Sequence, residues 1–516
     1  MNLFTSFAAR FGQFHCRATA ANSHERASRI KSIVLAALLC GVALAFTACS
    51  SDNPDNPNPA TTMSLTVNGE HYDIALPTDG AVDLITLNTE FDAEFDIDNA
   101  NEFERLTIGG NEVKGGHLAL PIAKIAKDKQ IEIAYTTGGK RGTVTLNTLH
   151  SGIPEIIASG HAVIEGDFYL SFIYQRLIMK YDNSGNILFY RYAPTPNVGT
   201  LDELGYWDFK KHNFGGKTYY SYHAPDDRYA DRAFTGYDPG MRVLLDDHYK
   251  PVKTIQALQS LDGYLAEGEP IDGHDFYFFT PDHYILSAYV KREFDGNDCI
   301  VSYLQEVKDG EVVFDWWCTE HPEMMDWRSD LFDTSYDLVH FNSMQVLPDG
   351  NLLCSFRHLC SVVKIDRTSE TREKGLGSII WRIAGDNQPE EKWSFYGQHY
   401  VRLHPNGTLT IFDNGNGHDP QHTRALRLTI DPLTGEVQGG GDLLSPGGGY
   451  FTQACGALML FDEGFTVGWG WSTEEGNNTR LVTEHNASGR LIFSLHRSAD
   501  DCSPASPNPS YRCVKY

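Results

Sequence analysis

The chain of 516 residues is long enough for more than one domain and a sizeable hydrophobic core. Its 41% hydrophobic and 12% aromatic residues, together with 47 Gly, exclude an intrinsically disordered chain and are typical of a β-rich globular protein. The net charge of −26 argues against nucleic acid as a partner, although a local pocket in an acidic protein can still be positive and bind an anion.

The first 48 residues have the features of a secretory signal. A basic flank and a short apolar run, Ile33–Phe46, precede small residues and then Cys49. This order predicts a lipoprotein signal peptide over 1–48, with lipidation of Cys49 and anchoring in the bacterial cell envelope, facing the periplasm or in the outer membrane. A transmembrane anchor is the alternative, but the apolar run is too short to span a bilayer comfortably. Residues 49–61 are predicted to be a polar, Pro- and Asn-rich tether.

Seven of the ten cysteines remain after Cys16, Cys40 and Cys49 are set aside. In an oxidising envelope some of these seven are expected to form disulfides, although connectivity does not follow from sequence. No Cys-x-x-Cys motif or zinc-type spacing is present in the sequence. The candidate pairs, judged by proximity in sequence, are Cys502 with Cys513, Cys299 with Cys318, and Cys354 with Cys360.

Residues 62–150 alternate apolar and polar side chains with frequent turns. Phe91–Ile97 and Ile131–Tyr135 are two such segments, and their period of two is typical of half-buried strands. This pattern predicts a small N-terminal β-sandwich domain.

Residues 155–516 contain about six β-units that end alike. In each end, a turn is followed by an apolar strand that carries an aromatic residue. Six units of this kind predict a six-bladed β-propeller, so the whole chain is expected to be all-β. The expected innermost strands start near Phe168, Trp207, His274, His340, His399 and Ala454.

Three successive units place a histidine at the same position. His274, His340 and His399 each precede a strand, a Pro-Asp or Pro-Asn turn and a second apolar strand, and they lie 66 and 59 residues apart. In a propeller the start of each innermost strand lines the central channel. We therefore expect the three imidazoles to converge on one mouth of the channel.

Arg357 and Asn342 are expected to join this cluster. Arg357 is predicted in the second strand of the His340 unit, whereas its neighbour His358 should point to the opposite face. Asn342 lies two residues past His340 and hence on the same strand face. A guanidinium, an amide and three imidazoles suit a small oxyanion such as sulfate or phosphate, with one histidine as nucleophile. Packing by repeated histidines is one alternative and a three-histidine zinc site is another, but Arg357 argues against a cation, so no metal is predicted.

The residues around these positions resemble the bacterial PAPS-independent arylsulfate sulfotransferases. The resemblance covers roughly 155–516 and departs from the family at the His274 unit, where Pro-Asp-His replaces Pro-Asp-Gly. The matching segments are His340-Phe-Asn-Ser, Ser355-Phe-Arg-His, Ile379-Ile-Trp-Arg-Ile-Ala-Gly, Gln398-His399 and Leu409-Thr-Ile-Phe-Asp-Asn-Gly.

The resemblance implies transfer of a sulfuryl group from an aryl sulfate to a phenolic acceptor, with His399 as the covalent nucleophile. It assigns sulfuryl binding to His274, His340 and Arg357 and a substrate contact to Asn342. No cofactor is implied, and no motif for a nucleotide sulfate donor is found in the sequence. The competing hypothesis is a non-catalytic envelope propeller that binds an anionic ligand or a protein partner.

Overall fold

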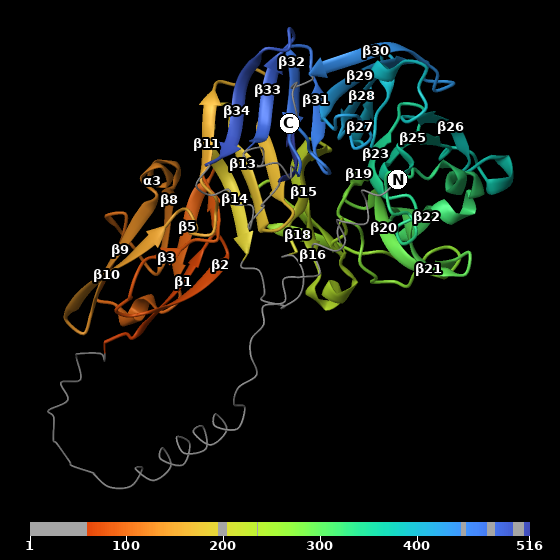
Figure 1. Ribbon diagram of the computed structural model, residues 1–516. Helices are drawn as coiled ribbons and strands as arrows, with labels where there is room; N and C mark the ends of the chain where they lie inside the picture. Colours follow the sequence, from red (N-terminus) through yellow and green to blue (C-terminus); the bar gives the residue numbers. More distant parts are fainter. Residues whose placement is uncertain (1–58, 194–203, 235, 445–449, 472–479, 499–509) are drawn as a thin grey trace, which may run out of the picture. The chain divides into compact units, whose positions relative to one another are not determined.

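The computed structural model describes residues 59–193, 204–234, 236–444, 450–471, 480–498 and 510–516. This part of the chain is nearly all β, which confirms the all-β part of the predicted fold class, and its strands run from red to blue along the sequence in Figure 1. No helix in these ranges is both long and apolar enough to cross a membrane. Cys49, the predicted signal peptide and all but the last three residues of the predicted tether lie outside the described residues.

Two sheets are formed by residues 62–147. Their strands alternate buried and exposed residues, as in β9, because each sheet has one face on the core and one in solvent. The first sheet has the order β2 (Glu70–Ala75), β1 (Thr62–Val67), β5 (Asp92–Ile97), β8 (His117–Pro121). The second has the order β3 (Val82–Asp83), β10 (Lys140–Asn147), β9 (Gln130–Thr137), β6 (Arg105–Ile108), β7 (Asn111–Glu112). One short α-helix, α3 (Ala123–Asp128), precedes β9.

Six antiparallel sheets follow, four of which use four consecutive strands. These four are β15 (Trp207–Phe214), β16 (Lys217–Pro225), β17 (Gly240–Leu245), β18 (Pro251–Ile255); β19 (Phe276–Thr280), β20 (His283–Phe294), β21 (Asn297–Lys308), β22 (Glu311–Trp317); β23 (Phe341–Val346), β24 (Leu352–Phe356), β25 (Ser361–Ile365), β26 (Ile379–Ala384); and β27 (His399–Leu403), β28 (Thr408–Asp413), β29 (Arg424–Ile430), β30 (Val437–Leu444).

The other two sheets exchange strands between the beginning and the end of this segment. One has the order β35 (Ser510–Lys515), β12 (Phe168–Phe172), β13 (Arg176–Tyr181), β14 (Ile187–Ala193), β4 (Thr86–Asn88). The other has the order β11 (Ile156–Gly160), β34 (Leu491–Arg497), β33 (Arg480–Asn486), β32 (Gly464–Gly468), β31 (Ala457–Leu460). The early strand β11 therefore pairs with the late strand β34, and the late strand β35 pairs with the early strand β12.

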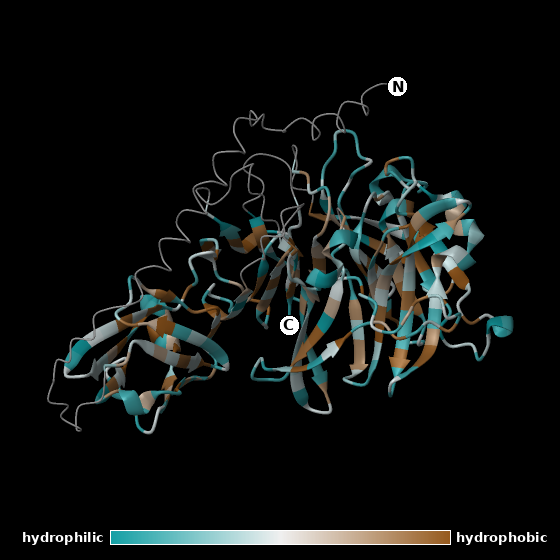
Figure 2. Cartoon of the chain, turned by 90° about the horizontal axis from the view of Figure 1, so that it is seen from below, coloured by the Kyte–Doolittle hydropathy of each residue, from teal (hydrophilic) through white to brown (hydrophobic). Residues whose placement is uncertain are grey.

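The first strands of successive sheets contact one another. Each contacts the next in the series β12, β15, β19, β23, β27 and β31. The last of these, β31, contacts β35, which pairs with β12. Burial differs among the strands, since β24 and β25 are buried throughout whereas β30, the fourth strand of the next sheet, has no fully buried residue. Hydrophobic residues gather in the strands and hydrophilic ones in many of the connecting loops (Figure 2).

Short 3₁₀ helices occupy several of the loops. They are η1 (Ala100–Glu102), η2 (Asp227–Arg232), η3 (Cys318–Glu320), η4 (Pro322–Trp327), η5 (Arg357–Leu359), η6 (Arg372–Lys374) and η7 (Glu391–Trp393).

Two of the disulfides expected from sequence proximity are absent among the described residues. Cys299, Cys318, Cys354 and Cys360 are all buried free thiols. In the β21–β22 hairpin Trp317 pairs with Tyr303. Cys318, the residue after Trp317, therefore does not lie opposite Cys299. Cys513 is also a free thiol, and its suggested partner Cys502 lies outside the described residues.

Candidate functional site

The three histidines stand at the starts of three consecutive sheets. His274 lies two residues before β19, His340 immediately before β23, and His399 is the first residue of β27. All three are buried. The rings of His274 and His340 meet edge to face, with centroids 5.0 Å apart. Burial, followed by the positive charge of Arg357 and the nearby His274 and His340, lowers the pKa of His399 well below its ordinary value. The structure therefore brings the three rings and Arg357 into one cluster.

Irregular backbone places these histidines. His340 has φ of 52° and Tyr400 has φ of 47°, a left-handed conformation that residues other than glycine rarely adopt. The strand register shifts between Phe341 and Ser343 and again between His399 and Arg402. Bulges of this kind re-aim side chains next to functional sites, and each left-handed residue costs on the order of 1–3 kcal/mol that the surrounding fold must offset.

His399 is held in one tautomer by its neighbours. Its Nδ1 lies 2.7 Å from Oδ1 of Asn414 and 3.1 Å from the carbonyl oxygen of Gly397, both of which are acceptors. Nδ1 must therefore carry the proton. Nε2 accepts a hydrogen bond of 3.2 Å from the backbone N–H of Cys455, as only an unprotonated nitrogen can.

The orientation of the Asn414 amide is itself determined. Its Nδ2 donates to the carbonyl oxygens of Thr452 at 2.8 Å and Cys455 at 3.1 Å, which leaves Oδ1 as the group facing His399. Asn414 is fully buried directly after β28. The neutral tautomer of His399, with a lone pair on Nε2, follows from this network.

His274 is paired with a buried carboxylate. Its Nδ1 donates to Oδ1 of Asp272 at 2.7 Å, and its backbone N–H donates to Oδ2 of the same residue at 3.2 Å. Ser287 donates a third hydrogen bond to Asp272, with 2.9 Å between Oγ and Oδ2. The carboxylate is thus satisfied by three donors although it is removed from water.

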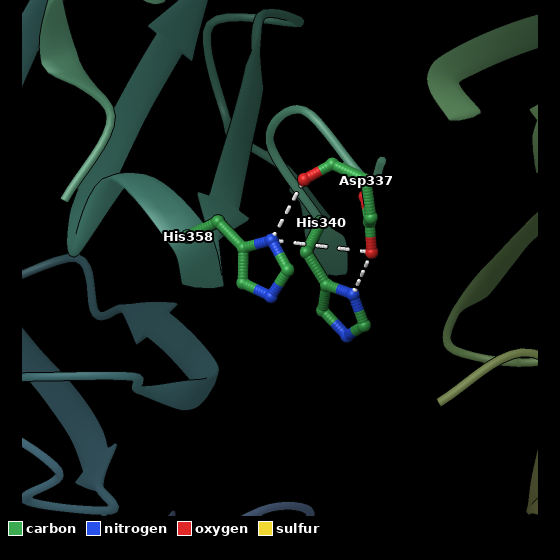
Figure 3. Close-up of side chains that lie close together, drawn as sticks. All are labelled: Asp337, His340 and His358. Atoms are coloured by element: carbon green, nitrogen blue, oxygen red, sulfur yellow. Dashed lines mark hydrogen bonds and ion pairs between the residues drawn. The ribbon is translucent and has the colours of Figure 1, made fainter. Parts of the chain in front are cut away.

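His340 has the same kind of partner. Its Nδ1 lies 2.5 Å from Oδ2 of Asp337. A dashed line marks this contact in Figure 3. Burial raises the pKa of Asp337 to about 6. Burial also lowers the pKa of His340 well below its ordinary value, and the nearby His274 and Arg357 lower it further. Nε2 of His340 and Nε2 of His274 have no hydrogen-bond partner within the described part of the chain.

His358 belongs to the same cluster, which corrects the expectation that it points away. Its ring stacks on His340 with centroids 4.7 Å apart, and its Nδ1 donates to the backbone carbonyl of Asp337 at 2.9 Å (Figure 3). The expectation assumed a continuing strand, whereas β24 ends at Phe356 and η5 begins at Arg357. The alternation of side chains across a strand therefore stops one residue before Arg357.

Asp337, His340 and His358 also form a geometric candidate for a metal site, because their ligand atoms lie within 4.8 Å of one another. In the arrangement seen, both Nδ1 atoms instead donate to oxygens of Asp337. Ligands at about 2.0–2.1 Å from one zinc ion lie roughly 3.3 Å apart in a tetrahedral site, further than the 2.5 Å between His340 and Asp337. The donor geometry fits a hydrogen-bonded cluster better than a zinc site.

Arg357 begins η5 and reaches the cluster from there, not from a strand as predicted. Its Nη2 donates to the carbonyl oxygen of Gln453 at 3.1 Å, and its guanidinium lies 4.3 Å from the ring centroid of Phe332. The Nε atom is buried without a hydrogen-bond partner among the described residues. A buried donor left unpaired is costly unless a ligand accepts from it, so Arg357 is suited to bind an anion.

Asn342 supports the backbone next to His399. Its Nδ2 donates to the carbonyl oxygen of Gln398 at 2.7 Å, and the Gln398 side chain in turn donates to Ser355 at 3.0 Å. Both residues are fully buried. The predicted contact between Asn342 and substrate stays a prediction, and the observed contact positions the peptide that carries His399.

Sequence reasoning missed the acceptors behind the three rings. The predicted cluster of imidazoles, guanidinium and amide included no carboxylate, whereas Asp272 and Asp337 are hydrogen-bonded to two of the histidines. The available signal was local, since Asp272 precedes His274 by two residues and Asp337 precedes His340 by three. Asn414 lies fifteen residues from His399, and only the pairing of β27 with β28 brings it close.

Histidines from three sheets, an arginine and two carboxylates thus lie together in a buried polar site of an all-β chain. The model of the family described as arylsulfotransferase (ASST) matches residues 297–497, which confirms the resemblance over that segment. The matched segment contains His340, Arg357 and His399 but not His274. This domain supports arylsulfotransferase activity in general.

Other comparisons are less specific. No curated protein matches the chain. A Bacteroides caccae protein of unknown function is 9% identical, with 68% of this chain and 99% of that chain covered and a TM-score of 0.38. The periplasmic gluconolactonase of Pseudomonas aeruginosa is 13% identical (63% and 82% covered, TM-score 0.34). The virginiamycin B lyase of Staphylococcus aureus is 9% identical (78% and 98% covered, TM-score 0.34). These values are too low to support a statement about activity.

Proposed function

We propose that this protein transfers a sulfuryl group from an aryl sulfate to a phenolic acceptor through a covalent sulfohistidine on His399, without PAPS. The observation that carries the proposal is the tautomer of His399. Oδ1 of Asn414 accepts a hydrogen bond from the protonated Nδ1, so the lone pair on Nε2 is available for attack on sulfur. The lowered pKa keeps this imidazole neutral at physiological pH.

Attack requires Nε2 to give up its hydrogen bond to Cys455. That bond is 3.2 Å long and neutral, and a neutral hydrogen bond contributes only about 0.5–1.5 kcal/mol. The first transfer breaks the bond between sulfur and the phenolic oxygen, and the departing phenol then leaves the site. A second phenol attacks the same sulfur from the position the first one vacated, which restores His399.

Binding of the sulfuryl oxygens and of the leaving phenolic oxygen falls to Arg357, His274 and His340. Arg357 carries an unpaired buried Nε and a fixed positive charge, and these complement an oxyanion in a site with little water. Because a positive group aimed at developing charge costs no reorganisation during the reaction, it stabilises the transition state more than the bound substrate.

The proposal includes the arrangement that holds this site. Residues 155–516 would form a six-bladed propeller and residues 62–150 a sandwich. The ordered contacts between first strands, and the pairing of β35 with β12 and of β11 with β34, support the propeller. A channel lined by first strands explains why His274, His340 and His399 meet. Lipidation of Cys49 would hold the protein in the cell envelope.

A two-substrate assay tests the function. The protein is incubated with 4-nitrophenyl sulfate and phenol, and both nitrophenolate and phenyl sulfate are measured. Ping-pong transfer through one site gives parallel lines in double-reciprocal plots at several phenol concentrations. Intersecting lines would indicate a ternary complex and contradict a sulfohistidine intermediate. Stoichiometric binding without turnover would favour the non-catalytic propeller.

The site of the covalent adduct needs a separate experiment. Protein mixed with donor alone is digested at high pH, because an N-sulfonated imidazole is labile to acid, and the label is located by mass. We expect the label on the peptide containing His399 and none on those containing His274 or His340. Label on either of the latter would overturn the assignment of the nucleophile.

A further inference from the structure

The three histidines differ in what accepts their Nδ1 proton. His274 and His340 donate to the carboxylates of Asp272 and Asp337, whereas His399 donates to the neutral amide of Asn414. All six side chains are buried, so little water competes with these contacts. The three imidazoles therefore lie in one site but differ in the charge of their hydrogen-bond partners.

The two kinds of partner differ in how strongly they stabilise a protonated ring. A carboxylate at Nδ1 stabilises an imidazolium, and so raises the affinity of Nε2 for a proton, because it places a full negative charge beside the ring. An amide oxygen carries no net charge and orients the ring without compensating a positive charge. The geometry therefore makes the two rings backed by a carboxylate better suited to hold a proton at Nε2 than the ring backed by an amide.

We propose that Asp272 and Asp337 are positioning residues that make His274 and His340 the proton carriers of the site, while Asn414 keeps Nε2 of His399 free for attack. This inference rests on the proposed sulfuryl transfer. It adds Asp272, Asp337 and Asn414 to the site. It also assigns proton transfer or nucleophilic attack to each histidine according to its hydrogen-bond partner.

The chemistry balances with one proton held by the carboxylate-backed pair of histidines. In the first step the Nε2 lone pair of His399 forms the N–S bond, and the S–O bond breaks with its electrons on the phenolic oxygen. That oxygen takes the proton from Nε2 of His274 or His340, and neutral phenol leaves. In the second step the acceptor phenol returns a proton to the same Nε2 while its oxygen bonds to sulfur and the N–S pair returns to His399.

Other groups face these two rings. Arg357 opposes protonation of His340, and His358 stacks on it with a pKa that burial and His340 lower to about 3. Tyr289 packs against both rings, with centroids 5.5 Å from His274 and 5.6 Å from His340, and Tyr511 packs against His274 at 5.8 Å. Burial raises the pKa of both tyrosines well above the ordinary value, so they stay neutral. Asp272 and Asp337 are thus the groups that offset a positive charge on these rings.

The first test varies the leaving group. Asp272→Asn and Asp337→Asn each keep the shape of the side chain and remove its charge. A phenol that is a poor leaving group needs a proton, whereas 4-nitrophenolate leaves readily without one. We expect at least one variant to lose on the order of 10²-fold in the rate of sulfo-enzyme formation from phenyl sulfate, the size of a general-acid contribution, and clearly less from 4-nitrophenyl sulfate.

A matched control separates this effect from simple destabilisation. Glu306 is a buried carboxylate paired with His283 at 2.6 Å, and neither residue is part of the site. Glu306→Gln should leave the ratio of the two rates unchanged. If neither aspartate variant changes the ratio, or if Glu306→Gln changes it equally, the role of the carboxylates is refuted.

The second test reads the tautomers without turnover. Side-chain ¹⁵N NMR of the wild-type protein should show His399 as the neutral Nδ1–H form across pH 5–8, with His274 and His340 distinct from it. Asn414→Asp should raise the proton affinity of His399 and abolish the adduct at neutral pH. If this variant does not fold, the wild-type spectra decide. An Nε2–H tautomer at His399, or three histidines with the same titration behaviour, would overturn the inference.

The two tests also separate the inference from the function on which it rests. A wild-type protein that turns over no aryl sulfate would refute the proposed function. Its NMR spectra would still report whether the histidines with carboxylate partners differ in tautomer and titration from the one with an amide partner. Turnover with equal leaving-group sensitivity in all variants would support the proposed function and refute the separate roles of the three histidines.

Discussion

Arg357 occupies a position where the type of cation matters as well as its charge. Its guanidinium is anchored by one hydrogen bond to Gln453 and by the face of Phe332, and its buried Nε remains unpaired among the described residues. A planar fork held in this way can bind two oxygens of a sulfuryl group at once. Residue-scale chemistry of this kind decides what the site binds.

Replacing Arg357 by lysine should therefore slow transfer although the charge is kept. We expect a loss of roughly 10²–10³ in kcat/KM, comparable to the removal of one oxyanion donor. Steady-state kinetics with 4-nitrophenyl sulfate and phenol measure the loss, and circular dichroism checks the fold. A lysine variant with unchanged kinetics would remove Arg357 from the site.

The lowered pKa of His399 makes a prediction about pH. A histidine whose pKa lies well below its ordinary 6.5 stays neutral as the pH falls through that value, so it remains a nucleophile. The rate of sulfo-enzyme formation from 4-nitrophenyl sulfate should not decrease between pH 8 and pH 6. Stopped-flow release of nitrophenolate measures it, and a rate that falls with an apparent pKa near 6.5 contradicts the expected burial effect.

At the scale of elements, the loop between β16 and β17 comes close to the histidines. Gly236 has φ of 92°, and a side-chain carbon at this position would lie 3.0 Å from Cε1 of His340. Gly216, in the β15–β16 turn, has φ of 78° but nothing within 4 Å of the same position. The two glycines share a left-handed backbone and differ in what surrounds them.

Substituting alanine at each glycine separates these effects. Both variants should lose about 1–2 kcal/mol of stability from the left-handed backbone. Gly236→Ala should also displace the His340 ring and reduce turnover at least tenfold, whereas Gly216→Ala should retain full activity. Thermal unfolding and steady-state rates are measured for both. Equal activities would show that the β16–β17 loop does not constrain His340.

At the scale of the whole molecule, β35 joins the end of the chain to its beginning and to the site. Besides its pairing with β12, Tyr511 donates to the carbonyl oxygen of His274 at 2.7 Å, and Arg512 forms a buried ion pair with Asp208 at 3.0 Å. Arg512 also donates to the carbonyl oxygen of Asn342. One terminal strand thus contacts residues from three other sheets.

Deleting residues 510–516 should therefore destabilise more of the protein than the sheet edge at which β35 pairs with β12. Removal takes Arg512 from the buried carboxylate of Asp208, which keeps Arg242 and Lys210 as partners, and exposes one side of β12. We therefore expect a lower melting temperature, loss of activity and less cooperative unfolding. Calorimetry measures this. Tyr511→Phe, which removes a single hydroxyl, should cost only about 1 kcal/mol. A truncated protein that is stable and active would contradict the structural role of β35.

Membrane attachment is the other prediction at this scale. If Cys49 is lipidated, Cys49→Ala should move the protein from the membrane fraction to the soluble fraction, because one lost anchor removes the acyl chains that bind the bilayer. Fractionation and immunoblotting measure the distribution. Cys16→Ala, in the predicted signal peptide, serves as the control and should fractionate as the wild type does. A Cys49→Ala protein that stays with membranes would contradict lipidation.

Sequence by itself determined the all-β class, the strand starts near Phe168, Trp207 and His399, and the convergence of histidines from three units. These features follow from local alternation and from repetition, which a sequence displays directly. The family match over 297–497 agrees with the segments on which the resemblance was based.

Only the tertiary structure decided how those histidines are used. The bulges at His340 and Tyr400 and the end of β24 before Arg357 break the alternation from which side-chain directions are read. Asn414 reaches His399 through strand pairing, so no local spacing predicts it. Asp272 and Asp337 were visible in the sequence, but their hydrogen bonds depend on backbone geometry that alternation does not specify. The acceptor behind each imidazole is a property of three-dimensional contact, which local spacing in the sequence does not specify.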